Sequence, residues 1–195
     1  MRKVLQLLSV VVVGIAVALM LISPELVLIF GSPKYREAVY VIPPVAASVF
    51  FIFIYNILSM PQFYYEKTQF LMAASMAAAG ANVVLNFIFI RLFGYIAAGY
   101  TTLACYMLYS VGHYIVSKRI LVNEGIQENL MSPGFLVACS VFLIGASIIC
   151  NLIFPYRILR YAILLASAGL VFWKKELLLK TMADIRKKIK KWGRI

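Results

Sequence analysis

The sequence predicts an all-α fold: a polytopic membrane helix bundle of about six transmembrane helices, followed by a basic amphipathic C-terminal helix. Of its 195 residues, 64% are hydrophobic and 13% are charged, with a mean hydropathy of +0.93. Soluble domains are about half apolar and about one-quarter charged. Apolar runs of about 20 residues, long enough to cross a bilayer as helix, recur with short polar joints between them. A membrane β-barrel would instead show alternating strands of about ten residues.

These runs define one transmembrane bundle over residues 1–173 and a cytoplasmic tail over residues 174–195. The six expected spans are Val4–Ile22, Val39–Met60, Phe70–Ile90, Ile96–Val116, Phe135–Phe154 and Ile158–Trp173. Pro24, which follows Ser23, is expected to end or kink the first span because proline lacks the helical N–H donor. Glu25–Phe30 is then expected to form a short helix at the far interface.

The first run also has features of a secretory signal peptide. Arg2 and Lys3 precede it, and Ala16-Val17-Ala18 fits the small-residue cleavage pattern. The apolar run continues through Leu19–Ile22, however, which favours an uncleaved first membrane helix.

The distribution of lysine and arginine predicts the orientation, because cytoplasmic loops carry an excess of both. With the N-terminus in the cytoplasm, 14 cations lie on the inner side and five on the outer side. Nine of the 14 lie in the tail, so the assignment depends on the tail and on an even number of spans. We expect a multi-pass protein of the cytoplasmic (inner) membrane with both termini in the cytoplasm.

Signals for catalysis and metal binding are missing from the sequence. It contains no GxSxG, HExxH, P-loop or Rossmann motif, and its seven carboxylates are spread along the chain. Cys105, Cys139 and Cys150 lie in apolar runs without CxxC spacing. We therefore expect no enzyme activity, no cofactor and no metal. The concentration of cations in the tail also argues against a nucleic-acid-binding body.

Two asparagines in the third span are the first candidates for substrate binding. Asn82 and Asn86 are one turn apart, and Ser75 lies on the same face of the helix. Amides at membrane depth need a neighbouring helix or a wet cavity, so this stripe either binds sugar hydroxyls or joins helices. Asn56 is a further candidate for sugar hydroxyls. Arg91, at the end of the span, either reaches the lipid headgroups or holds an anionic diphosphate.

Small residues indicate that the third span is an interior helix. Ala73, Ala77 and Ala81 recur at four-residue spacing, which lets another helix approach closely. An interior position would make its polar stripe face something other than lipid.

Three further residues are candidates for gating or proton transfer. His113 lies in the fourth span, where it is either a packing residue or a proton relay. Glu66 and Lys67 follow the second span and either lie among headgroups or line a cytoplasmic gate.

The tail is predicted to lie on the membrane surface. Its apolar residues recur at helical spacing with cations over the remaining face, a pattern typical of helices on anionic lipid. The residues expected to contact lipid are Lys187, Lys188, Lys190, Lys191 and Trp192.

Two stretches resemble a known transporter family. SPELVLIFG at residues 23–31, followed by Tyr35 and Ala38, resembles a helix joint of the polysaccharide and O-antigen flippases, which move lipid-linked oligosaccharides. NVVLN at residues 82–86, followed by Ile90, Gly94, Ala98 and Thr102, resembles their next hairpin. The flippases belong to the multidrug/oligosaccharidyl-lipid/polysaccharide exporter superfamily. The sequence departs from their pattern at Arg91, Ala97 and Thr101, where proline, glycine and alanine are usual.

The resemblance implies that this chain corresponds to the C-terminal six helices of a two-lobe flippase. Translocation by alternating access would then need a missing N-terminal lobe or a second copy. We expect a truncated C-terminal fragment, with membrane lipids and a lipid-linked glycan as the other partners. The alternatives are a multidrug or small-solute exporter of the same superfamily, or a structural membrane subunit of a glycan-synthesis complex that transports nothing.

Overall fold

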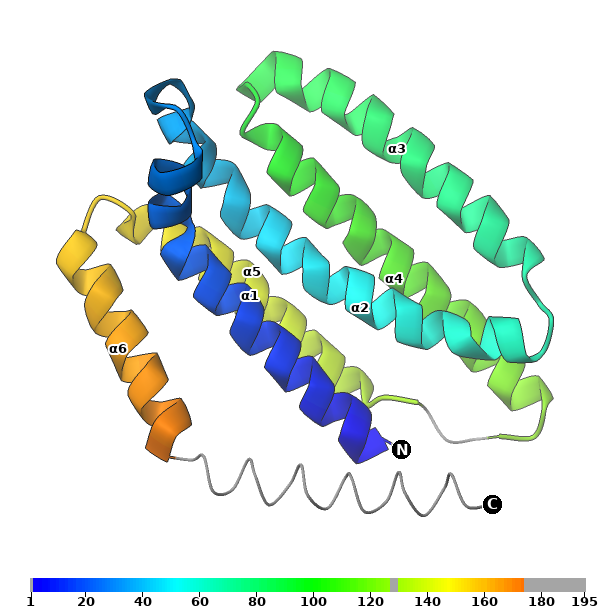
Figure 1. The fold of residues 1–195 in the computed structure, drawn as a ribbon. Helices are drawn as coiled ribbons and strands as arrows, with labels where there is room; N and C mark the ends of the chain where they lie inside the picture. The colour runs from blue at the N-terminus through cyan, green and yellow to red at the C-terminus, as the bar shows by residue number, and fades with distance from the viewer. Residues whose placement is uncertain (1, 127–129, 174–195) are drawn as a thin grey trace. The chain divides into compact units, whose positions relative to one another are not determined.

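The structure, a computed structural model, describes residues 2–126 and 130–173 and contains only helices in those ranges. The helices are α1 (Arg2–Phe30), a 3₁₀ segment η1 (Pro33–Val41), α2 (Ile42–Tyr64), α3 (Gln69–Phe93), α4 (Ala97–Asn123), α5 (Pro133–Ile153) and α6 (Arg157–Trp173) (Figure 1). The all-α prediction is therefore confirmed, and each expected span overlaps one helix. The predicted surface helix in the tail lies outside the described residues.

Several helices are long and apolar enough to cross a membrane. By length and composition these are α1, the combined segment Lys34–Tyr64, α3 and α5. The remaining two, α4 and α6, are not among them. Over its described length α6 has 17 residues, and α4 carries hydroxyl side chains, a histidine and two cations. The count of six spans and the orientation stay predictions.

The expectation that Pro24 ends the first span is wrong. Pro24 lies inside α1, which continues to Phe30, so Glu25–Phe30 is not a separate helix. A proline at this position leaves the Met20 carbonyl without its helical N–H partner. The Ser23 hydroxyl donates a hydrogen bond to that carbonyl at 2.8 Å, which replaces the missing donor.

The start of the second helix also differs from the prediction. The expected span begins at Val39, but the chain remains in the 3₁₀ segment to Val41 and α2 begins at Ile42. Pro43 and Pro44 occupy the first turn of α2, where a missing N–H costs nothing because the first N–H groups of a helix have no partner within it.

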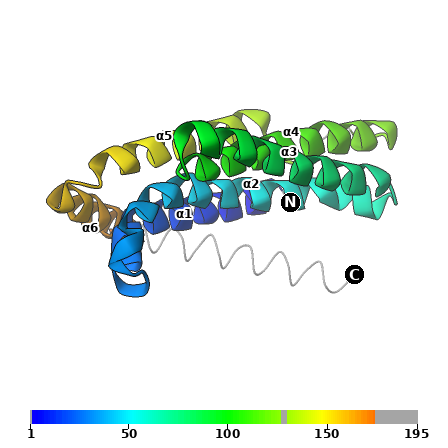
Figure 2. The same cartoon turned by 90° about the horizontal axis from the view of Figure 1, so that it is seen from above.

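The chain divides into two compact units, Met1–Leu152 and Ile153–Ile195. The first unit holds α1 to α5, and α6 belongs to the second. Within the first unit α2 is central, because α1 packs along one side of it and α4 along another (Figure 1). Seen from above, α4 and α5 lie on one side of α1 and α2 (Figure 2). The buried face of α2 includes Ala46, Ala47, Phe50, Phe51 and Ile54.

The α3–α4 hairpin turns at Gly94, as the sequence predicts. Gly94 has φ 77° and ψ 179°, which a residue with a side chain avoids, and its N–H bonds to the Ile90 carbonyl. The Tyr95 hydroxyl then donates to the Glu37 carboxylate at 3.0 Å, which ties this turn to η1. Desolvation and the hydrogen bond to that carboxylate raise the pKa of Tyr95.

Candidate functional site

Polar side chains of α3 and α4 meet along the contact between these two helices. The Asn86 amide donates to Asn82 Oδ1 at 2.8 Å, and the Thr101 hydroxyl donates to Asn86 Oδ1. Asn82 Nδ2 lies 3.5 Å from the Thr102 hydroxyl, at the outer limit of a hydrogen bond. The two predicted amides are therefore brought together, and both reach α4.

The polar line continues toward the other end of α3. Ser75 and Tyr109 share a hydrogen bond of 2.6 Å between their hydroxyl oxygens. Between this pair and the amides lies a cleft of about 260 Å³, lined by Ala74, Ala77, Ala78, Ala81, Leu85, Cys105, Leu108, Tyr109 and Gly112. We call the whole line, from Ser75–Tyr109 to Asn86–Thr101, the α3–α4 seam. The small residues of α3 leave the space for this cleft.

The prediction that α3 is an interior helix is wrong for this chain. None of the residues of α3 is buried. By contrast, more than half of the most apolar stretch of Lys34–Tyr64, the segment that contains α2, is buried. Helix α3 packs on α4 and leaves its other faces open (Figure 1). Small residues permit a close approach, but they do not show how many sides are occupied. The seam therefore lies at the edge of the first unit.

The other two proposed substrate residues make their contacts within their own helices. The exposed Asn56 donates to the Ile52 carbonyl one turn earlier, at 2.7 Å. The Arg91 guanidinium stacks 3.9 Å from the centre of the Phe87 ring. Arg91 lies about 140° around α3 from Asn86, so it points away from the amide pair.

His113 lies in a buried polar cluster between α2 and α4. Its Nδ1 accepts a hydrogen bond of 2.8 Å from the Gln62 amide, and neither residue is exposed to any measurable extent. With Gln62 as donor, the ring carries its proton on Nε2. Three buried atoms here make no hydrogen bond: His113 Nε2, Gln62 Oε1 and Ser117 Oγ. Ser117 is one turn from His113 on α4, so the unsatisfied atoms lie on the same stretch of the α2–α4 contact.

Aromatic rings surround His113. The ring of Tyr109 is 4.5 Å away between centroids, that of Phe70 is 5.6 Å away and that of Tyr55 is 5.8 Å away. Tyr109 is also the partner of Ser75, so one side chain touches both the α3–α4 seam and the buried histidine.

Glu66 and Lys67 lie in the exposed turn between α2 and α3. Glu66 has φ 56°, and the Lys67 N–H bonds to the Gln62 carbonyl at 2.8 Å, which closes the end of α2. Their backbone therefore forms the C-terminal cap of α2, whose last helical residue is Tyr64. The predicted lipid-contacting residues Lys187, Lys188, Lys190, Lys191 and Trp192 lie outside the described residues.

Metal-ligating side chains do not gather in the described ranges, where no group of three or more His, Cys, Asp or Glu could hold an ion. Cys105, Cys139 and Cys150 are all free thiols.

Several residues that make helix-to-helix contacts were not predicted from the sequence. Gln62 of α2 is fully buried and bonds to His113 of α4, and the Ser110 hydroxyl donates to the Phe51 carbonyl of α2 at 2.8 Å. Asn151 of α5 donates to the Tyr100 hydroxyl at 2.9 Å. For each of these contacts, the signal in the sequence was a polar residue inside an apolar run. Nothing in the sequence distinguishes these residues from Ser140, whose hydroxyl bonds within its own helix.

Comparison with known proteins gives no match: no family model fits the chain, and no curated protein and no solved structure is significantly similar to it. The resemblance to flippases therefore rests on the two motifs quoted above.

Proposed function

We propose that this chain is one lobe of a membrane translocator for a lipid-linked oligosaccharide or polysaccharide precursor, with the α3–α4 seam facing the path of the glycan. The observation that carries the proposal is the position of this polar seam on α3, a membrane-length helix that buries none of its residues. Polar groups at that depth are unfavourable against lipid, so a wet path or a second protein surface must cover them.

The seam has suitable chemistry for a glycan. It presents amide and hydroxyl groups, which can donate to and accept from sugar hydroxyls, and it carries no charged side chain between Ser75 and Asn86. These two residues are 11 positions apart, so the polar line extends about 16 Å along α3. Asn82 is the residue best suited to bind, because its contact with Thr102 is long and weak.

A second lobe is part of the proposal. Alternating access needs two bundles that rock against each other around a midplane site. The open side of α3 is the surface on which a second copy, or a separate N-terminal lobe, would complete the cavity. The flippase motifs support the same division into two lobes.

The test measures movement of a fluorescent polyprenyl diphosphate disaccharide across vesicles that contain the full chain. A membrane-impermeant quencher reports which leaflet holds the probe. We expect the wild-type chain to accelerate exchange and Asn82→Ala to slow that acceleration about tenfold. Val83→Ala is the matched control, because Val83 is the neighbouring residue on α3 and is 68% exposed.

Two results would contradict transport along the seam by two copies of this chain. One is equal exchange by Asn82→Ala and Val83→Ala. The other is a wild-type chain that crosslinks to itself in the vesicles and still moves no probe.

A structural role is the second candidate. The hydrogen bonds that join Asn82, Asn86 and Thr101 within the chain favour it, because the amides are then partly satisfied without substrate. A structural subunit would lose stability in Asn86→Leu and would move no probe in any form.

A further inference from the structure

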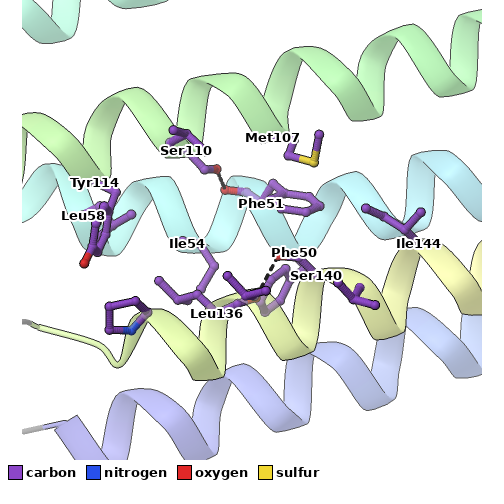
Figure 3. Close-up of a pocket in the computed structure, with 14 residues that line it drawn as sticks. Phe50, Phe51, Ile54, Leu58, Met107, Ser110, Tyr114, Leu136, Ser140 and Ile144 are labelled. Carbon is purple, nitrogen blue, oxygen red and sulfur yellow. Dashed lines mark hydrogen bonds between the residues drawn. The ribbon is translucent and has the colours of Figure 1, made fainter.

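An apolar groove lies between α2, α4 and α5 of the first unit (Figure 3). It shares no lining residue with the cleft of the α3–α4 seam. Its volume is about 340 Å³, and its lining includes Phe50 and Ile54 of α2, Met107 and Tyr114 of α4, and Leu136 and Ile144 of α5. On α5 the lining residues Val137 and Val141 are 62% and 66% exposed, so the groove opens sideways to the bilayer.

The groove offers little to a polar ligand. Two of its hydroxyls are already bonded to backbone carbonyls, that of Ser110 to Phe51 and that of Ser140 to Leu136, both at 2.8 Å (Figure 3). Apart from the Tyr114 hydroxyl, the remaining lining is almost entirely hydrocarbon, which suits an alkyl chain.

The length of the groove corresponds to one leaflet. On α5 it runs from Pro133, at the start of the helix, to Ile144, 11 residues further on. That distance is about 16 Å, or half of the hydrocarbon thickness of a bilayer. A chain that enters at the α4–α5 loop therefore reaches the end of the groove at about the midplane.

A positive charge marks the end where the chain would enter. The groove-lining residues of α4 include Met107, Val111 and Tyr114, and the same face continues to Lys118, one turn beyond Tyr114. Lys118 is exposed, and the positive N-terminal end of α5 lies at Pro133 on the same side of the groove. No acidic residue lies on α4 itself, and the first one after Lys118 in the sequence is Glu124, which follows the end of the helix.

We infer that this groove binds one acyl chain of an anionic phospholipid from the leaflet on the side of the α4–α5 loop, with the phosphate at Lys118. Basic residues beside a space between helices select anionic headgroups in this way. A phospholipid fits better than a longer polyprenyl carrier because the groove ends at leaflet depth. This inference does not depend on the proposed transport function.

The test is native mass spectrometry of the full-length chain released from vesicles of phosphatidylcholine and phosphatidylglycerol in equal amounts. We expect one phosphatidylglycerol to remain bound to the wild-type chain. Ser140→Trp and Val137→Trp should each lower the retained fraction about tenfold by filling the groove. Ile149→Trp is the control, since Ile149 is exposed on α5 but does not line the groove.

Lys118→Gln tests the headgroup contact without changing the packing. We expect it to lower the preference for phosphatidylglycerol over phosphatidylcholine about fivefold. Arg119→Gln, which removes an equal charge from the next position, should leave that preference unchanged. The inference is overturned if the wild-type chain keeps no phosphatidylglycerol, if the control and groove variants behave alike, or if added polyprenyl phosphate displaces the phospholipid.

Discussion

Gln62 and His113 join the buried faces of α2 and α4 through a hydrogen bond of 2.8 Å, although 51 positions separate them in sequence. Both side chains are fully buried, and each keeps one polar atom without a partner. The pair therefore contributes to the central contact of the first unit while retaining unused hydrogen-bonding capacity beside three aromatic rings.

This pair should be coupled in stability. Gln62→Leu and His113→Leu should each lower the free energy of unfolding by about 1–3 kcal/mol, because each leaves a buried polar group without its partner. The double variant should lose about 1 kcal/mol less than the sum of the single losses. Chemical unfolding in detergent measures this coupling. Asn56→Leu is the control, since Asn56 is exposed and bonds within α2, and additive losses at Gln62 and His113 would contradict the coupling.

Ser110 should contribute more to stability than Ser140. The Ser110 hydroxyl lies 2.8 Å from the Phe51 carbonyl of α2 and 2.9 Å from the Tyr106 carbonyl of its own helix, so it can donate to either. The Ser140 hydroxyl donates to Leu136 of its own helix. Ser110→Ala should therefore cost about 0.5–1 kcal/mol, and Ser140→Ala should cost close to nothing. The midpoint of thermal unfolding in detergent compares them, and equal midpoints would show that the bond between helices adds nothing.

Gly99 permits the close contact between the start of α4 and the η1–α2 junction. A methyl group there would lie 2.7 Å from Pro44 Cγ and 2.9 Å from the Val41 carbonyl oxygen. Gly99→Ala should cost about 1–3 kcal/mol because the helices must move apart. At Gly112, on the same helix, the nearest atom is Phe70 Cζ at an ordinary 3.7 Å, so Gly112→Ala should be neutral or slightly stabilising. Similar unfolding energies for the two variants would refute the contact.

Two turns with positive φ should change in stability in opposite directions when a side chain is removed or added. Removing the side chain of Glu66 should stabilise its turn, and adding one at Gly94 should destabilise its turn. Glu66 holds φ 56°, a conformation that costs a residue with a side chain about 1–2 kcal/mol, so Glu66→Gly should stabilise the α2–α3 turn by about 1 kcal/mol. Gly94→Ala should destabilise the α3–α4 turn, since Gly94 has φ 77° and ψ 179°. Unfolding in detergent measures both.

Glu66→Ala separates the backbone effect from the charge. It removes the carboxylate but keeps the strained conformation, so it should not reproduce the gain of Glu66→Gly. A gain of equal size would mean that the charge, rather than the backbone, is responsible.

The hairpin of α3 and α4 was largely predictable because its signals are local. The apolar run, the Asn82–Asn86 spacing and the glycine at position 94 depend only on neighbours along the chain, and the structure confirms the turn. The partners Thr101 and Thr102 were not predictable. They depend on the register between two helices, which packing along the whole hairpin determines.

Of the two expected effects of Pro24, an end to the first span is wrong for a similar reason. Proline removes a donor wherever it occurs in a helix, but its effect depends on whether another group bonds to the carbonyl left open. Here the neighbouring Ser23 does so. The small-residue pattern of α3 likewise predicted a close contact but not that α3 would pack on one helix and remain open elsewhere.

By itself, the sequence determined that this protein is helical and apolar enough for a membrane, because composition and the length of apolar runs control both properties. The tertiary structure alone decided which polar residues meet. It paired Gln62 with His113, joined Asn86 to Thr101, and left a groove of about 340 Å³ beside α5. Hydrogen bonds and cavities depend on the relative position of residues far apart in the chain, and helical periodicity carries no information about that position.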